Sequence, residues 1–97
     1  MKLCRIGELG KEKPAIIDKD GSYKDLSKVI SDLNPDNLKF EIIEKIKKLN
    51  IKDLPTLDVG SRIGACVKNP SKFLGIGLNF KDHATEQNLP IPKEPII

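Results

Sequence analysis

Residues 80–88 are the part of the sequence whose residue types and spacing are best suited to chemistry. His83 is the only histidine of the chain, and Glu86 follows it at i+3. On a helix these two positions share one face, where a carboxylate can orient an imidazole and hold its proton, as a general base requires. An exposed and weakly paired histidine on a helix has the same pattern, and spacing alone favours that interpretation.

The neighbouring residues must set this helix in place. Residues 73–76 form a short apolar segment with the length of a buried strand, and Gly75 and Gly77 permit a sharp change of direction or a close backbone approach. Asn79 is suited to cap the helix that follows. Prolines at 90, 92 and 95 limit that helix to roughly two turns.

Two glycine-containing stretches match ligand loops only in part. Gly75 and Gly77 begin like a dinucleotide fingerprint, but Phe80 stands where its third glycine is needed. Residues 18–29 begin like a calcium loop. Their glycine comes at loop position four instead of six, and Val29 replaces the bidentate glutamate. Neither stretch predicts a cofactor site.

The N-terminal residues predict a hairpin followed by short helices. Residues 2–8 and 14–18 alternate as strands do, and the Asp-Gly turn within residues 18–22 joins antiparallel partners. Asp25 or Ser27 is expected to start a short helix that contains Val29 and Ile30. Asn34 and Pro35 then have the residue types of a cap and first position of a second helix.

That second helix carries an apolar stripe of four residues, Leu38, Ile42, Ile46 and Leu49. The stripe is expected to pack against the N-terminal sheet, and Asn50 is suited to end the helix in the left-handed conformation. A partner helix could cover the stripe instead, but a core role is favoured because the chain has few other apolar surfaces. Residues 54–70 resemble an extended linker with a short strand at 62–67. The fold class is therefore α+β.

Composition and charge narrow the function classes. With no Trp, one Tyr and three Phe, the core must be built from Ile, Leu and Val. Seventeen basic and fourteen acidic residues give a net charge of +3, and the lysines are scattered. The densest basic run, at 45–48, follows Glu41 and Glu44 at i+4 spacing, which is typical of a solvated, self-paired face. Nucleic acid is therefore not an expected partner.

The cellular compartment is constrained by what the sequence lacks. It has neither the apolar run of a signal peptide nor one long enough to span a bilayer, so we expect a cytoplasmic protein without a membrane partner. Cys4 and Cys66 are then expected to be free thiols and small core residues.

Taken together, residues 76–86 and 90–95 resemble the start of the catalytic domain of the fumarylacetoacetate hydrolase family, which includes 2-hydroxyhepta-2,4-diene-1,7-dioate isomerases, ureidoglycolate lyases and acylpyruvases. The matching runs read Ile-Gly-Leu-Asn-Phe-Lys-Asp-His-Ala-Thr-Glu and Pro-Ile-Pro-Lys-Glu-Pro. Residues 1–70 resemble the small N-terminal domain of bacterial members. The resemblance implies a boundary near residue 70, with residues 71–97 contributing the first strand and lid helix of a truncated, mostly-β catalytic domain.

The resemblance also implies a chemistry. Family members act on 2-oxo or 1,3-dicarbonyl acids, hydrolysing carbon–carbon bonds, decarboxylating, isomerising or eliminating. Mg²⁺, or Mn²⁺ or Ca²⁺, stabilises the developing enolate. His83 matches the general base and Glu86 its carboxylate partner, within a segment that resembles a lid over the substrate. Phe80 stands where many members have Tyr, so any hydrogen bond of that hydroxyl is lost.

The expected metal ligands, a Glu-x-Glu pair and a later Asp, lie beyond Ile97. The chain alone is therefore expected to bind no metal ion tightly and to be nearly inactive, and a homodimer is expected only at full length. An alternative is a non-catalytic remnant or interaction module that complements a separate catalytic chain. The sequence does not select one substrate or reaction within the family.

Overall fold

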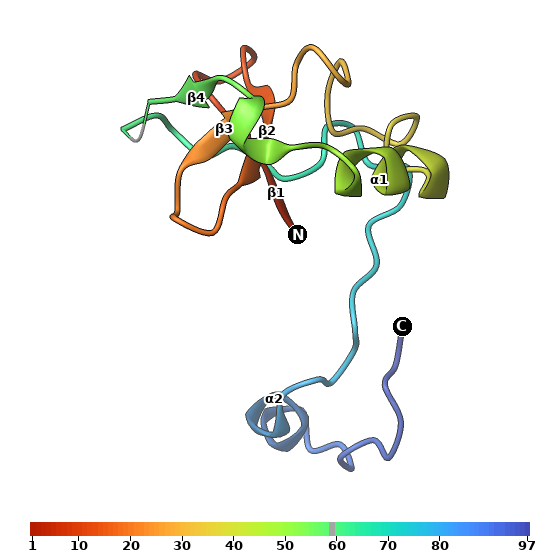
Figure 1. Ribbon diagram of the computed structural model, residues 1–97. Coiled ribbons are helices and arrows are strands. Elements are labelled where there is room, and N and C mark those ends of the chain that lie inside the picture. The colour runs from red at the N-terminus through yellow and green to blue at the C-terminus, as the bar shows by residue number, and fades with distance from the viewer. Residues whose placement is uncertain (59) are drawn as a thin grey trace.

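The computed structural model describes residues 1–58 and 60–97, and it contains a four-stranded antiparallel sheet (Figure 1). The strands pair in the order β1 (Lys2–Ile6), β2 (Lys13–Ile17), β3 (Tyr23–Asp25) and β4 (Thr56–Leu57). The helical elements are α1 (Phe40–Lys47), the 3-10 turn η1 (Ile51–Asp53) and α2 (Lys81–Glu86). This is a small α+β fold, as the sequence predicts.

The predicted hairpin between the second and third strands is confirmed. In its turn the amide of Asp18 donates to the carbonyl of Ser22 (2.9 Å) and the amide of Gly21 donates to the carbonyl of Asp18 (3.0 Å). Gly21 has a φ of +84°, which a residue with a side chain adopts only at a cost. The Asp-Gly pair therefore sets the register in which Ile17 lies opposite Tyr23.

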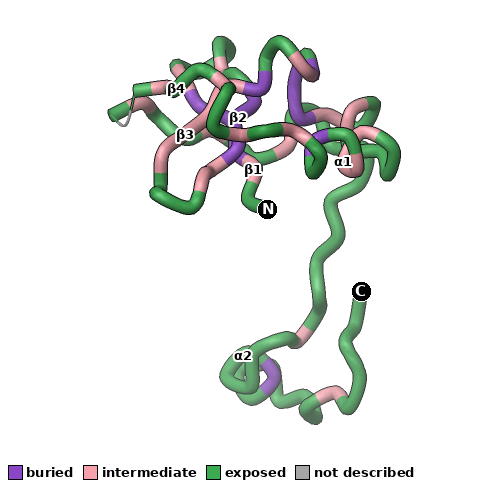
Figure 2. The backbone as a smooth tube through the Cα atoms, viewed as in Figure 1, coloured by how far each residue is buried: buried purple, intermediate pink, exposed green. Residues whose placement is uncertain are grey.

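Most buried residues lie in the N-terminal sheet and the segments next to it (Figure 2). Successive side chains of β1 and β2 point to opposite sides, so the sheet has apolar residues on both faces. Leu3 and Ile16 are partners in the register and belong to one cluster, and Cys4 and Ala15 are partners that belong to the other. The larger cluster is wholly aliphatic, which confirms the predicted core composition. Its buried members are Ile16, Leu26, Ile30, Leu33 and Ile46.

Helix α1 covers this larger cluster with the predicted apolar stripe. Ile46 is 1% exposed, and Ile42 packs against the buried residues. Leu49 also packs there, although it lies just beyond the end of the helix. Leu38 lies outside the helix and is exposed, so that member of the stripe was wrong. On the solvent side Lys47 pairs with Glu44 at 3.1 Å, which is i,i+3 spacing rather than the expected i,i+4.

The expected helices between residues 25 and 38 are wrong, since this stretch forms hydrogen-bonded turns. The amides of Val29 and Ile30 both donate to the carbonyl of Leu26 (2.8 and 3.0 Å), and this single turn does not continue into a helix. Asn34 does cap, because its Oδ1 accepts from the amide of Asn37 (3.1 Å), but it caps a single turn. The Asn37 side chain then donates to the carbonyl of Asp32 (3.0 Å), which holds the chain away from a continuous helical path. Helix α1 begins only at Phe40.

Two further boundary predictions are corrected. Asn50 has a φ of −80° and precedes η1, so it is not a left-handed cap. Its side chain instead donates to Asp53 (3.0 Å). The strand expected at 62–67 is reduced to a single bridge between Ile63 and Ile6.

Residues 69–97 leave the sheet as an extended segment and turn back through α2 (Figure 1). The radius of gyration is 17.8 Å, whereas a compact chain of this size has about 13 Å. Residues 73–76 are exposed and form no strand, with Phe73 94% exposed, so the buried strand expected there was wrong. A strand needs a partner along its length, and the nearest pairing is the single bridge between Gly77 and Ile96, just after this segment.

Both cysteines are free thiols, as expected. Cys4 is buried, and this burial raises the pKa of its thiol. Cys66 is exposed, so its expected core position was wrong. Among the described helices, none has the length and apolar character needed to cross a membrane.

Because Leu26 is fully buried in the larger cluster, Leu26→Ala is expected to lower the free energy of unfolding by about 3 kcal/mol through lost transfer energy and a residual cavity. Urea unfolding followed by circular dichroism measures the change. Leu9→Ala is the matched control, because Leu9 is 82% exposed. Equal effects of the two substitutions would contradict the assigned core.

Candidate functional site

Helix α2 carries both residues that the sequence predicts as catalytic. It follows Phe80, whose ψ of 136° is extended, and no side chain caps it, so the capping role expected for Asn79 was wrong. The helix ends where Asn88 adopts a φ of +54° and the amide of Leu89 donates to the carbonyl of Ala84 (2.9 Å). Pro90 then prevents another turn. The short helix expected between 80 and 88 is confirmed.

His83 and Glu86 both lie exposed on this helix, and Ala84 is its buried residue. The side-chain hydrogen bond within α2 runs from Thr85 Oγ1 to the carbonyl of Lys81 (3.1 Å). Within the described residues, no hydrogen bond or ion pair joins His83 to Glu86. The structure therefore places the two residues on one short helix, open to solvent, without coupling them.

The two stretches that carry the sequence motif are brought together beside α2. The amide of Gly77 donates to the carbonyl of Ile96, and a Cβ at Gly77 would lie 3.3 Å from Ile96 Cγ2. A shallow pocket of about 240 Å³ forms between residues 76–79 and 91–95. Sequence analysis predicted a close approach at this glycine, but it did not predict its partner. His83 and Glu86 do not line the pocket.

The described residues do not fit a catalytic metal ion. No three His, Cys, Asp or Glu side chains among them gather closely enough to hold one. His83 and Glu86 would offer only two donors from a single helix, fewer than the three protein ligands of a catalytic zinc ion. No metal-dependent step can be derived from this chain's own residues.

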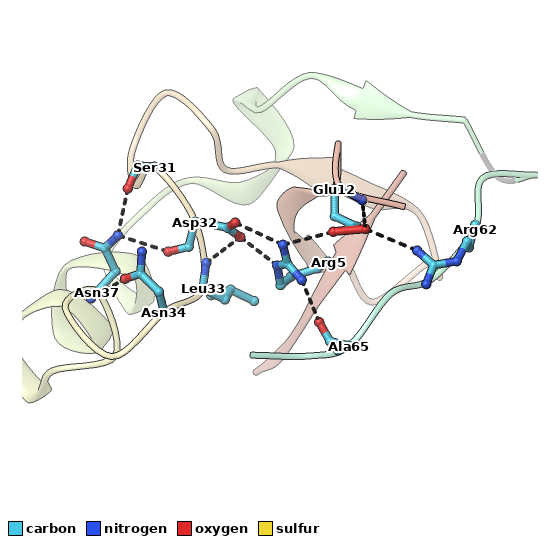
Figure 3. Close-up of polar contacts among 10 residues, drawn as sticks. Arg5, Glu12, Ser31, Asp32, Leu33, Asn34, Asn37, Arg62 and Ala65 are labelled. Carbon is cyan, nitrogen blue, oxygen red and sulfur yellow. Dashed lines mark hydrogen bonds and ion pairs between the residues drawn. The ribbon is translucent and has the colours of Figure 1, made fainter. Parts of the chain in front are cut away.

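A buried cluster of charged side chains surrounds Arg5, and the sequence patterns did not predict it (Figure 3). Its guanidinium makes two bonds to Asp32, Nε to Oδ1 at 2.8 Å and Nη2 to Oδ2 at 3.1 Å. Nη2 also donates to Glu12 Oε2 (3.0 Å), and Nη1 donates to the carbonyl of Ala65 (3.2 Å). Arg62 adds a second cation, 3.3 Å from Glu12 Oε1.

Each carboxylate of the cluster is held in its charged form. The hydrogen bond from Arg5 lowers the pKa of Asp32, with further help from the amide of Leu33 at 2.8 Å. The amide of Gly10, 2.7 Å from Oε1, lowers the pKa of Glu12, as does the charge of Arg5. Burial opposes both effects, because it disfavours an ionised carboxyl group.

The Arg5 cluster is structural rather than catalytic. All its charges are paired internally, and it joins β1, the loop after it, the turn at 32–33 and the segment at 62–65. The signal that could have revealed it is Arg5 itself. This residue stands in the apolar strand β1 on the same side as Leu3, where a charge needs a buried partner.

The comparisons with known proteins place the whole chain beside longer bacterial proteins. No family model matches it. It is 45% identical over 97 residues to a protein of Burkholderia lata named "putative hydrolase", and equally so to one of Burkholderia ambifaria with the same name. In both cases the match includes 100% of this chain and 34% of the relative. The chain therefore spans about a third of the length of the curated relatives it matches.

The Arg5 cluster makes stability depend on pH. Because the pKa of Asp32 is lower in the folded state, its stabilisation is complete above the unfolded pKa of about 3.9 and is lost as pH falls through the folded value. Asp32→Asn is expected to cost about 3 kcal/mol at pH 7, because it leaves Arg5 underpaired. It is also expected to flatten the loss of stability below about pH 4.

Urea unfolding between pH 7 and pH 3 measures both effects. Asp36→Asn is the matched control, because Asp36 is exposed. If Asp32→Asn behaves like Asp36→Asn at pH 7, the cluster does not stabilise the fold.

Proposed function

We propose that this chain supplies the N-terminal part of a metal-dependent enzyme of the fumarylacetoacetate hydrolase type, acting on 2-oxo or 1,3-dicarbonyl acids. Two observations support the proposal. The motif at 76–95 resembles that family, and the chain is 45% identical along its whole length to proteins named as hydrolases. Residues 1–70 are the proposed N-terminal domain, and residues 71–97 the proposed beginning of the catalytic domain.

The observation that carries the proposal is the placement of His83 and Glu86 on one short, exposed helix. An exposed imidazole is accessible to a water molecule or a substrate proton, and a carboxylate at i+3 is within reach of the imidazolium that forms. In the proposed mechanism His83 accepts that proton and Glu86 orients the ring. The segment around them then orders over the substrate as a lid, which excludes water.

The proposed metal ion is Mg²⁺ or a similar hard cation, which would stabilise the enolate that develops on the substrate. We assign its ligands to the part of the relatives' length that this chain does not span, because the described residues form no such site. The reaction is one of carbon–carbon hydrolysis, decarboxylation, isomerisation or elimination. The complete enzyme is proposed to be a cytoplasmic homodimer.

The role of His83 can be tested in a chimera in which the Burkholderia lata relative supplies the length that this chain does not span. His83→Ala is expected to lower kcat for an acylpyruvate by about 100-fold to 10,000-fold, which is the contribution of a positioned general base. Glu86→Gln is expected to lower kcat less, because it misorients the base without removing it.

Lys81→Ala is the matched control for these two variants. Lys81 lies on the same helix and is exposed, so its removal is expected to leave kcat unchanged. Circular dichroism of all variants reports whether the fold is intact. Unchanged turnover in a folded His83→Ala chimera would refute the assigned base.

A second candidate function is favoured by the exposed apolar side chains of residues 71–97. Phe73, Leu74, Phe80 and Ile97 are all more than 60% exposed, and large apolar surfaces mark sites of interaction. In this alternative the chain is a non-catalytic module, and its exposed segment pairs with a separately encoded catalytic chain.

Mixing two separate polypeptides distinguishes the enzyme function from the interaction module. The 97-residue chain is combined with a second polypeptide that contains the remaining length of the Burkholderia lata relative, and the turnover of acylpyruvate and oxaloacetate is followed with Mg²⁺. Turnover only in the mixture, abolished by His83→Ala, is expected if the chain is a working part of a split enzyme. A stable complex whose activity is insensitive to His83→Ala would instead identify an interaction module.

A further inference from the structure

A groove on the N-terminal part of the fold belongs neither to α2 nor to the Arg5 cluster. It has a volume of about 600 Å³ and lies among the start of β1, the turn after β2 and the end of α1. Ile16 and Ile46, which are almost completely buried, form its floor, and Met1, Ile17 and Ile51 add apolar wall. This volume is in the range of small-molecule sites, which are also mainly apolar.

The rim of the groove is predominantly cationic. Lys2 and Lys19 are exposed at the same end of the sheet, because Lys2 lies opposite Ile17 and Lys19 follows two residues later. In the part of the chain that the structure describes, neither lysine takes part in an ion pair. Lys47 is a third cation on the rim, and Glu44 neutralises it at 3.1 Å.

Asp18 is the carboxylate on this rim, and it accepts a hydrogen bond within the turn. Its Oδ1 accepts from the amide of Lys19 at 2.7 Å, so it is directed toward the backbone. The groove thus combines an apolar floor with two lysines at one end. This arrangement is complementary to a molecule with an apolar body and a single anionic head.

We propose that this groove binds an amphipathic carboxylate, a small molecule with an aliphatic chain and a carboxylate at one end. The chain lies along the apolar wall of Met1, Ile17 and Ile51, and the carboxylate lies between Lys2 and Lys19. A small molecule is favoured over a polypeptide segment, because the volume of about 600 Å³ is in the range of small-molecule sites. The site is independent of His83 and Glu86.

The proposal is tested by titrating the ¹⁵N-labelled 97-residue chain with octanoate at low ionic strength and following its amide resonances. Shifts are expected at residues 2, 17–21 and 46–51. Affinity is expected to rise about twofold for each methylene added from butanoate to octanoate, which is less than full burial would give because the groove is open. Octylamine and 1-octanol serve as cationic and neutral probes, and both are expected to bind at least fivefold more weakly than octanoate.

Charge reversal on the rim distinguishes binding in the groove from non-specific binding of octanoate. Lys2→Glu and Lys19→Glu are each expected to weaken octanoate binding by about fivefold, which is the scale of an exposed ion pair. Lys45→Glu is the matched control, because Lys45 is exposed on α1 and does not line the groove. It changes the net charge equally, and it is expected to leave binding within twofold of the unaltered chain.

Several outcomes would overturn the proposal. Equal binding of octylamine and octanoate would remove the carboxylate preference, and an equal loss in Lys45→Glu would reduce the effect to net charge. Groove shifts that grow with protein concentration without octanoate would assign the surface to a second copy of the chain. Shifts confined to residues 71–97 would place the apolar probe on the exposed segment instead.

Discussion

The need to neutralise a buried guanidinium is the constraint on which most of the N-terminal structure depends. Arg5 is 6% exposed within strand β1, and a charge in that position is costly unless it is paired and fully hydrogen-bonded. Asp32, Glu12 and the carbonyl of Ala65 meet that need from three different parts of the sequence. Satisfying one side chain therefore fixes the paths of three connecting segments.

The same constraint explains where regular structure gives way to turns. Asp32 binds both Arg5 and the amide of Leu33, so the chain around it cannot continue as a helix. The segment at 62–65 is held against β1 by the contact between Arg5 and Ala65 and by the bonds of Gly7 and Gly64 with Arg62 and Arg5. A last bond joins the amide of Lys68 to the carbonyl of Leu33 (2.7 Å). Beyond it the chain leaves the domain as an extended segment.

Local patterns in the sequence predicted the features that depend on interactions between residues close together in the sequence. The hairpin, the aliphatic core, the stripe on α1 and the short helix that carries His83 follow from alternation, turn residues and helical spacing. The turns at 25–38 could not be predicted, because Asp32 is held by Arg5 from a distant strand. The Asn37 side chain in turn bonds to the carbonyl of Asp32 and so competes with a helix. The exposure of Phe73 was missed for a similar reason, since an apolar run becomes a buried strand only where a sheet is present to receive it. The candidate catalytic residues were located on their helix, but their pairing depends on surroundings that this segment does not provide.

Because only one of the two cysteines is exposed, the molecule has a single accessible thiol for chemical labelling. The thiol of Cys4 is enclosed by the sheet, and the raised pKa leaves it little thiolate at neutral pH. Cys66 is exposed and directly follows Ala65, the residue bound by Arg5. A maleimide dye or spin label would therefore attach at a single position without mutagenesis. That position lies where the ordered N-terminal part meets the extended segment, so the label's rotational freedom would report how firmly the two are joined.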